Sequence, residues 1–200
     1  MRSFPPSRIV CLTEETVETL YRLGEQGRIV GVSGYAVRPP EVRREKPRVS
    51  AFTSADIPKI LALEPDLVLT FSDLQADIAA ALIRAGVAVH AFNHRDIAGI
   101  FAMIRTVGAL VDAPRKAETL VAELENRVAV ARRRRDGQAR PKVYFEEWDA
   151  PLISGIGWVS ELVEIAGGQD VFAGLGAMKS ASDHDFSAEA FIAAMPDIVI

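Results

Sequence analysis

Two places in the sequence carry side chains with the chemistry of a catalytic or metal site. Cys11 follows an apolar run and precedes a Thr-Glu-Glu segment, and a thiol beside a helix N-terminus can have a lowered pKa. Asp183-His184-Asp185 brings three metal-ligating side chains together on a polar segment. His90 and His94 are four residues apart, but we predict them on a strand and the following loop, so they need not share a face. We favour a packed thiol for Cys11 and a solvated loop for the acidic segment.

Two further motifs have a structural explanation. Ser154-Gly155-Ile156-Gly157 superficially resembles a dinucleotide-binding loop, but it lacks the third glycine and an acidic residue at the end of a following strand. We interpret it as a turn that leads into a helix. Arg132 to Arg135 form a basic run, which is typical of a solvated helix C-terminus because cations there complement the helix dipole.

A set of aromatic residues indicates a different kind of site, a ligand-binding surface. All are predicted at loop positions that follow strands or precede helices: Tyr35, Phe52, Phe71, Trp148 and Trp158. In open α/β sheets, ligands bind at the carboxyl ends of the strands. Aromatic rings at that edge can cover a large, flat, partly apolar ligand. Any single one of these residues is explained by a role in covering the edge of the sheet, but the whole set favours ligand binding.

Strands and helices are predicted to alternate along the chain and so to position these residues. The predicted strands are 8–12, 28–32, 66–70, 87–91 and 143–145. The predicted helices are 14–23, 58–63, 73–85, 96–110 and 159–166. Such alternation is typical of a mainly parallel sheet that helices cover on both faces.

One long helix and one internal sequence repeat predict two lobes. Residues 114–135 are predicted to form a helix of ~30 Å, about the diameter of a small domain. The sequence of residues 61–69 is similar to that of residues 192–200. Both copies indicate a short helix, a Pro-Asp corner and a buried strand. We therefore predict an N-terminal α/β lobe, a bridging helix and a partial C-terminal α/β lobe, at 1–112, 113–136 and 141–200. Since the second copy ends inside its strand, the C-terminal lobe is expected to be truncated.

Composition excludes several classes of protein. The chain has 200 residues, 49% of them hydrophobic and 25% charged, which excludes a disordered chain. Its net charge of −4 and pI near 5.5 argue against nucleic-acid binding, and no apolar run reaches the ~18 residues of a membrane span. The single cysteine forms no internal disulfide. The first residues lack the apolar region of a secretory signal, so the sequence predicts a cytoplasmic protein if this N-terminus is native.

Several segments resemble a known family. They are Arg8-Ile9-Val10, Ile29 to Tyr35 with Pro39-Pro40, Lys46 to Ser50, Ile60 to Val68, and Glu161 to Gly168. Together they are similar to class III solute-binding proteins, the cobalamin- and siderophore-binding components of ABC importers. The resemblance runs over nearly the whole chain and is closest to the cobalamin-binding branch.

The resemblance implies a fold of two α/β lobes bridged by one rigid helix, a ligand held between the lobes mainly by aromatic residues, and a periplasmic location. By motif position, Tyr35, Phe52 and Phe71 would line the first lobe and Trp148 the second, with Trp158 a weaker candidate. The ligand would be cobalamin or a related corrinoid, without catalysis or a metal or cofactor site of the protein's own. Two alternatives stay open: a ferric-siderophore or haem receptor, compatible with Arg38 and Arg95, and an α/β enzyme that uses Cys11 or Asp183-His184-Asp185.

The resemblance also implies one acidic docking residue per lobe for an ABC permease. Glu189 matches this position in the second lobe. In the first lobe the matching position is Pro58, and the nearby Asp56 could substitute or could only cap a helix. We therefore expect ligand binding with weak or absent docking to a permease.

Overall fold

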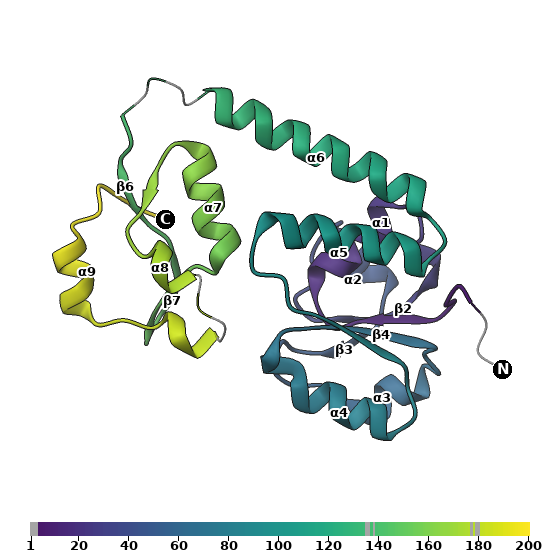
Figure 1. Cartoon of the computed structure of the whole chain (residues 1–200). Coiled ribbons are helices and arrows are strands. Elements are labelled where there is room, and N and C mark those ends of the chain that lie inside the picture. The colour runs from purple at the N-terminus through teal and green to yellow at the C-terminus, as the bar shows by residue number, and fades with distance from the viewer. Residues whose placement is uncertain (1–3, 135–136, 138, 177, 179–180) are drawn as a thin grey trace. The chain divides into compact units, whose positions relative to one another are not determined.

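The computed structural model describes residues 4–134, 137, 139–176, 178 and 181–200. The chain forms two compact units (Figure 1). Unit 1 comprises Met1–His94 and Phe101–Val121, and unit 2 comprises Arg95–Ile100 and Ala122–Ile200. Each unit contains a parallel sheet, which confirms the predicted α/β class.

Unit 1 is built on a five-stranded parallel sheet with the strand order β3-β2-β1-β4-β5. Its strands are β1 (Ile9–Cys11), β2 (Ile29–Ser33), β3 (Arg48–Ser50), β4 (Leu67–Phe71) and β5 (Val89–Phe92). The central strands β1 and β4 are buried along their whole length, which is why they are continuous apolar runs rather than alternating ones. The order reverses between β1 and β4, the place where open α/β sheets form a ligand crevice.

Helices cover both faces of this sheet. They are α1 (Glu14–Arg22), α2 (Val42–Glu45), α3 (Ile57–Ala62), α4 (Ala76–Arg84) and α5 (Ile97–Leu110), with 3-10 turns η1 (Gln26–Arg28) and η2 (Asp73–Gln75). Figure 1 shows α3 and α4 below the sheet, and α1 and α5 above it. Val10, Leu12, Ile60, Val68 and Leu82 form the apolar core of unit 1 together with Val49 and Val87.

The long helix α6 (Pro114–Arg134) begins at the predicted proline, and Arg135, its predicted end, lies outside the described residues. Its first turns pack on α5 at a very close approach. A Cβ atom added to Gly108 would lie only 2.4 Å from the Cβ atom of Ala117, so only glycine fits there. Lys116 extends this contact to the C-terminal end of α1, where its Nζ atom donates to the Leu23 carbonyl oxygen at 2.8 Å.

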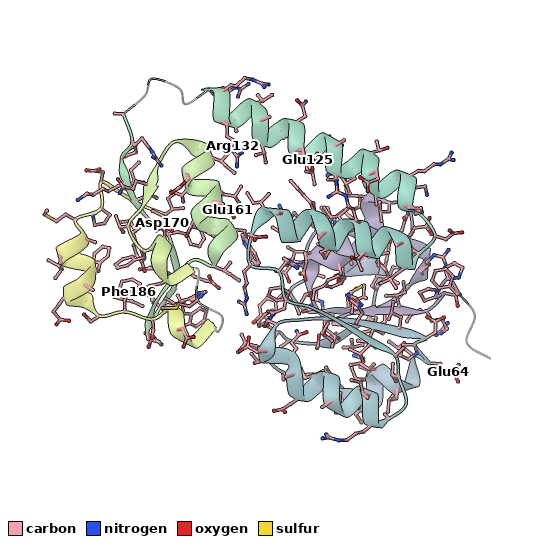
Figure 2. All side chains as sticks on the ribbon, viewed as in Figure 1. Glu64, Glu125, Arg132, Glu161, Asp170 and Phe186 are labelled. Atoms are coloured by element: carbon pink, nitrogen blue, oxygen red, sulfur yellow. The ribbon has the colours of Figure 1, made fainter. Side chains whose placement is uncertain are left out.

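Unit 2 contains a three-stranded parallel sheet with the order β10-β6-β9 and a separate antiparallel hairpin of β7 and β8. The strands are β6 (Lys142–Tyr144), β7 (Glu146–Asp149), β8 (Leu152–Ser154), β9 (Gln169–Asp170) and β10 (Ile198–Val199). The helices are α7 (Gly157–Ala166), α8 (Ala173–Gly176) and α9 (Ala188–Ala194), with the 3-10 turn η3 (Ala181–His184). The buried Tyr144 ring is the centre of this unit's core, with Phe172 and Phe186 edge-on against it (Figure 2 labels Phe186).

The Pro-Asp corner has the same hydrogen bonds in both units. In unit 1, the Asp66 carboxylate accepts from the backbone N–H of Arg8, whose guanidinium donates to the carbonyl oxygen of Leu63. In unit 2, the Asp197 carboxylate accepts from the backbone N–H of Lys142, whose ammonium donates to a carbonyl at the end of α9. The aspartate therefore ties the start of the first strand to the start of its parallel neighbour, β4 in unit 1 and β10 in unit 2.

Candidate ligand-binding site

Three of the predicted aromatic residues lie at the carboxyl edge of the unit 1 sheet. Tyr35 and Phe52 each follow a strand by two residues, β2 and β3 respectively, and Phe71 is the last residue of β4. Because these strands are parallel, their carboxyl ends lie along one edge. Tyr35 is 59% exposed and Phe52 is half-buried, whereas Phe71 is only 7% exposed. The first two therefore offer ring surface at this edge, whereas the Phe71 ring is buried.

Local hydrogen bonds fix the backbone of these loops. The Tyr35 N–H donates to the Ser33 hydroxyl at 3.2 Å, and the Gly34 N–H donates to the Ser50 carbonyl oxygen at 2.7 Å. These contacts join the loops after β2 and β3. Tyr35 consequently projects from an anchored turn, although most of its side chain is exposed.

The carboxyl end of β4 is turned sharply by Ser72, which has a positive φ of 61°. This conformation is uncommon for a non-glycine residue. The Ser72 hydroxyl accepts from the Leu74 N–H at 3.3 Å and so begins the η2 turn. Leu74, which is 42% exposed, follows Phe71 by three residues at this edge. Sequence reasoning did not select Leu74, because a lone leucine in a polar turn carries no pattern.

A histidine-aromatic cluster lies beside Phe71. The rings of Phe71 and His94 are 4.9 Å apart between centroids, and those of His90 and Phe92 are 4.4 Å apart. Partial burial lowers the pKa of His90 below its usual value. The cluster is aromatic packing at the carboxyl end of β5.

Unit 2 holds the two tryptophans. Trp148 lies on β7, in the hairpin that follows β6, and its side chain is 60% exposed. Its indole N–H donates to the Ala150 carbonyl oxygen at 3.1 Å, which orients the ring. Trp158 is in the first turn of α7 and is half-buried. Trp148 is thus the more accessible of the two.

The glycines before α7 serve close packing. A Cβ atom on Gly155 would lie 2.7 Å from a Val159 methyl, and one on Gly157 would lie 2.3 Å from the Arg95 carbonyl oxygen, which belongs to the same unit. The preceding strand β8 pairs antiparallel with β7, so the segment is not the strand-turn-helix of a parallel dinucleotide-binding unit.

The two places considered as catalytic sites, Cys11 and Asp183-His184-Asp185, lack the geometry of a catalytic site. Cys11 lies in the central strand with no exposed surface, and burial raises its thiol pKa to about 12. Its nucleophilic thiolate is therefore scarce at neutral pH. His184 is 2% exposed, whereas its neighbours Asp183 and Asp185 are exposed. Within the described part of the chain, no group of three His, Cys, Asp or Glu residues is arranged to hold a metal ion.

The two candidate docking acids differ in what they do. Asp56 caps α3, and its carboxylate accepts from the Lys59 N–H at 3.0 Å. Glu189 lies in the first turn of α9, fully exposed to solvent. Its own backbone N–H and the Ser187 hydroxyl lower its carboxyl pKa, so it is charged at neutral pH. Both carboxylates are thus exposed, and both also make local hydrogen bonds at the start of their helix.

Comparison with known proteins decides the family. The family model described as periplasmic binding protein matches residues 9–200. The chain belongs to the periplasmic binding protein family. This result confirms the resemblance in the sequence.

Individual relatives of this periplasmic binding protein are named as cobalamin-, haem- and vitamin B12-binding proteins. A cobalamin-binding protein of Halobacterium salinarum is 27% identical over 199 residues, which are 98% of this chain and 53% of that protein. The chain thus spans about half the length of this curated relative. Among solved structures, the haem-binding protein RhuT from Roseiflexus sp. RS-1 has a TM-score of 0.79 at 27% identity, covering 96% of this chain and 75% of that one. The vitamin B12 binding protein BtuF of Vibrio cholerae has a TM-score of 0.79 at 23% identity, covering 98% and 76%, and shows the shared fold.

Among the described residues, no helix is long and apolar enough to cross a membrane.

Proposed function

We propose that this periplasmic binding protein binds cobalamin or a related corrinoid without transforming it. The observation that carries the proposal is the aromatic carboxyl edge of unit 1, where Tyr35 and Phe52 present ring surface and Phe71 is buried. A corrinoid is large, flat and partly apolar, and aromatic rings cover such a ligand at a low cost in side-chain entropy. The cobalamin-binding relative, which matches 98% of this chain, supports the same ligand class.

In this proposal Trp148 supplies a second aromatic surface from unit 2, and Trp158 supports it. Trp148 is suited to this because it is largely exposed and its ring is oriented by a hydrogen bond to the Ala150 carbonyl. The protein contributes no metal ligand or cofactor of its own, since the corrinoid carries its own metal.

A ferric-siderophore or haem ligand is the second candidate, favoured by the similarity to the haem-binding protein RhuT. The propionate groups of haem carry negative charge, and the sequence suggested Arg38 and Arg95 as basic partners for such a ligand. Arg38 instead lies 3.5 Å from the Glu18 carboxylate, which offsets its charge.

An absorbance-monitored titration distinguishes these candidates. The protein is titrated with cyanocobalamin, haem and a ferric hydroxamate under the same conditions. We expect saturable 1:1 binding of cyanocobalamin, at least tenfold tighter than either iron ligand. Tighter binding of haem or the ferric hydroxamate would favour the second candidate. Absence of binding by all three ligands would refute the proposed function.

We further propose a periplasmic location and delivery to an ABC permease through Glu189 alone. The family description supports the location. Glu189 is exposed and matches the docking position that the resemblance implies in the second lobe, whereas Pro58, at the matching position of the first lobe, carries no charge. One exposed ion pair contributes about 0–1 kcal/mol, so docking should be weak compared with a protein that has an acidic residue on both lobes.

A further inference from the structure

The buried side chain of Gln75 occupies the point where β1 and β4 separate at the carboxyl edge. The ladder between these strands continues as far as the hydrogen bond from the Leu12 N–H to the Leu69 carbonyl at 2.9 Å. In a regular parallel ladder the next bond would run from the Phe71 N–H to the Leu12 carbonyl. Gln75 is inserted in its place.

The Gln75 amide replaces that missing bond on both sides. Its Oε1 atom accepts from the Phe71 N–H at 3.1 Å, and its Nε2 atom donates to the Leu12 carbonyl oxygen at 3.2 Å. The second N–H of Nε2 donates to the Phe52 carbonyl oxygen at 2.8 Å. One N–H donor and two carbonyl acceptors surround the amide, so only one orientation of its oxygen and nitrogen satisfies all three.

This arrangement links two loops that no backbone ladder joins. Phe52 follows the edge strand β3, whereas Phe71 ends β4, and β2 and β1 lie between these strands in the sheet. Gln75 is fully buried, so its three hydrogen bonds are shielded from competing water. Without it, one buried N–H donor and two carbonyl acceptors would lose these partners, which is costly in a protein interior.

We propose that Gln75 is a positioning residue for the aromatic ligand surface, holding the Phe52 loop against Phe71 in the absence of ligand. This inference rests on the proposed corrinoid function. Pre-ordering the loop removes an entropy cost that binding would otherwise have to meet. Gln75 itself does not touch the ligand, because no part of it reaches the surface.

The test compares Gln75→Leu with Leu82→Ala, a control in the same unit. Leu82 is also fully buried, but it lies in the apolar core beneath the sheet. Both variants should lower the melting temperature. We expect Gln75→Leu to raise the Kd for cyanocobalamin at least tenfold, measured well below both melting temperatures, and Leu82→Ala to change it less than threefold. Wild-type affinity in Gln75→Leu, or an equal loss in the control, would overturn the inference.

A ligand-free measurement separates this inference from the proposed function. Backbone amide hydrogen exchange should accelerate in Gln75→Leu at Phe71 and in the turn 51–54, but stay at wild-type rates there in Leu82→Ala. Unchanged exchange at these amides would refute the positioning role even if cyanocobalamin binds. Conversely, failure of the wild type to bind cyanocobalamin would refute the function, and the exchange result would still decide the role of Gln75.

Gln75→Glu provides a second variant should Gln75→Leu fail to fold. Glutamate has nearly the same shape and keeps an acceptor for the Phe71 N–H, but an ionised carboxylate cannot donate to the Leu12 and Phe52 carbonyls. Protonation restores one donor. We therefore expect weak cyanocobalamin binding at pH 8 that partly recovers toward pH 5, relative to the wild type at each pH. A pH-independent affinity equal to that of the wild type would contradict the inference.

Discussion

Replacing Tyr35 by alanine should weaken corrinoid binding without unfolding the protein. Tyr35 is 59% exposed, and its position depends on backbone contacts to Ser33 rather than on burial of its ring. An aromatic side chain presents ~200 Å² in total, so ~120 Å² of Tyr35 is accessible to a ligand. At ~25 cal/mol per Å² of area removed from water, complete coverage corresponds to ~3 kcal/mol. A flat ligand covers one ring face, about half of this area, so we expect a loss of ~1.5 kcal/mol, or about a 12-fold rise in Kd.

The assay is an absorbance titration with cyanocobalamin for the wild type, Tyr35→Ala and the control Phe4→Ala. Phe4 is also an exposed aromatic residue of unit 1, at 73%, but it precedes β1 and so lies toward the amino edge of the sheet. The control should bind as the wild type does, and all three proteins should melt within a few degrees of one another. Equal affinities for Tyr35→Ala and the wild type would refute the assignment of the carboxyl edge as the ligand surface.

Three further results are expected. Trp148→Ala should weaken cyanocobalamin binding by about 1–3 kcal/mol, as expected for an aromatic anchor, and an unchanged Kd in titration would exclude Trp148 from the site. The Cys11 thiol, with a pKa of about 12, should be ionised to only ~0.01% at pH 8; alkylation by iodoacetamide should thus require denaturant, and rapid alkylation of the folded protein would contradict its burial. In a pull-down with a cobalamin permease, wild-type binding should be weak, and Pro58→Glu should strengthen it. Tight wild-type binding that is lost in Glu189→Ala and not improved by Pro58→Glu would contradict the prediction of weak docking.

The elements that could be predicted from the sequence are buried strands and helices that begin or end at proline or glycine. The central strands are apolar runs because both of their faces are covered, so β1 and β4 could be recognised directly. Pro114 and Gly167 marked helix boundaries correctly, since proline fits the first helical position and Gly167 has the left-handed conformation of a helix end. The repeated Pro-Asp corner could be recognised because its aspartate makes the same contacts in both units.

Short and locally ambiguous elements were missed. The edge strand β3 has three residues and follows a proline-rich loop, and β9 has two residues, so neither shows a periodic pattern. The β7–β8 hairpin carries Glu146, Glu147 and Asp149, an acidic composition that is unusual for strands.

Tertiary contacts determine the remaining features of the site. Phe71 was predicted as a ligand-facing residue, but its ring is only 7% exposed and packs beside His94, which lies beyond the end of a different strand. Gln75 was not selected because a glutamine at a helix start is ordinary in sequence. Its role depends on carbonyls of Leu12 and Phe52, which are distant along the chain.

A crystal structure of the chain with cyanocobalamin would test the central claim most directly. We expect the corrin ring to be in van der Waals contact with the Tyr35 ring and with the Phe52 loop, at the carboxyl edge of the unit 1 sheet. The claim would be contradicted if the ligand occupied another hollow of unit 1, such as the one lined by Glu18, Tyr21 and Pro39, while the Tyr35 ring stayed in solvent.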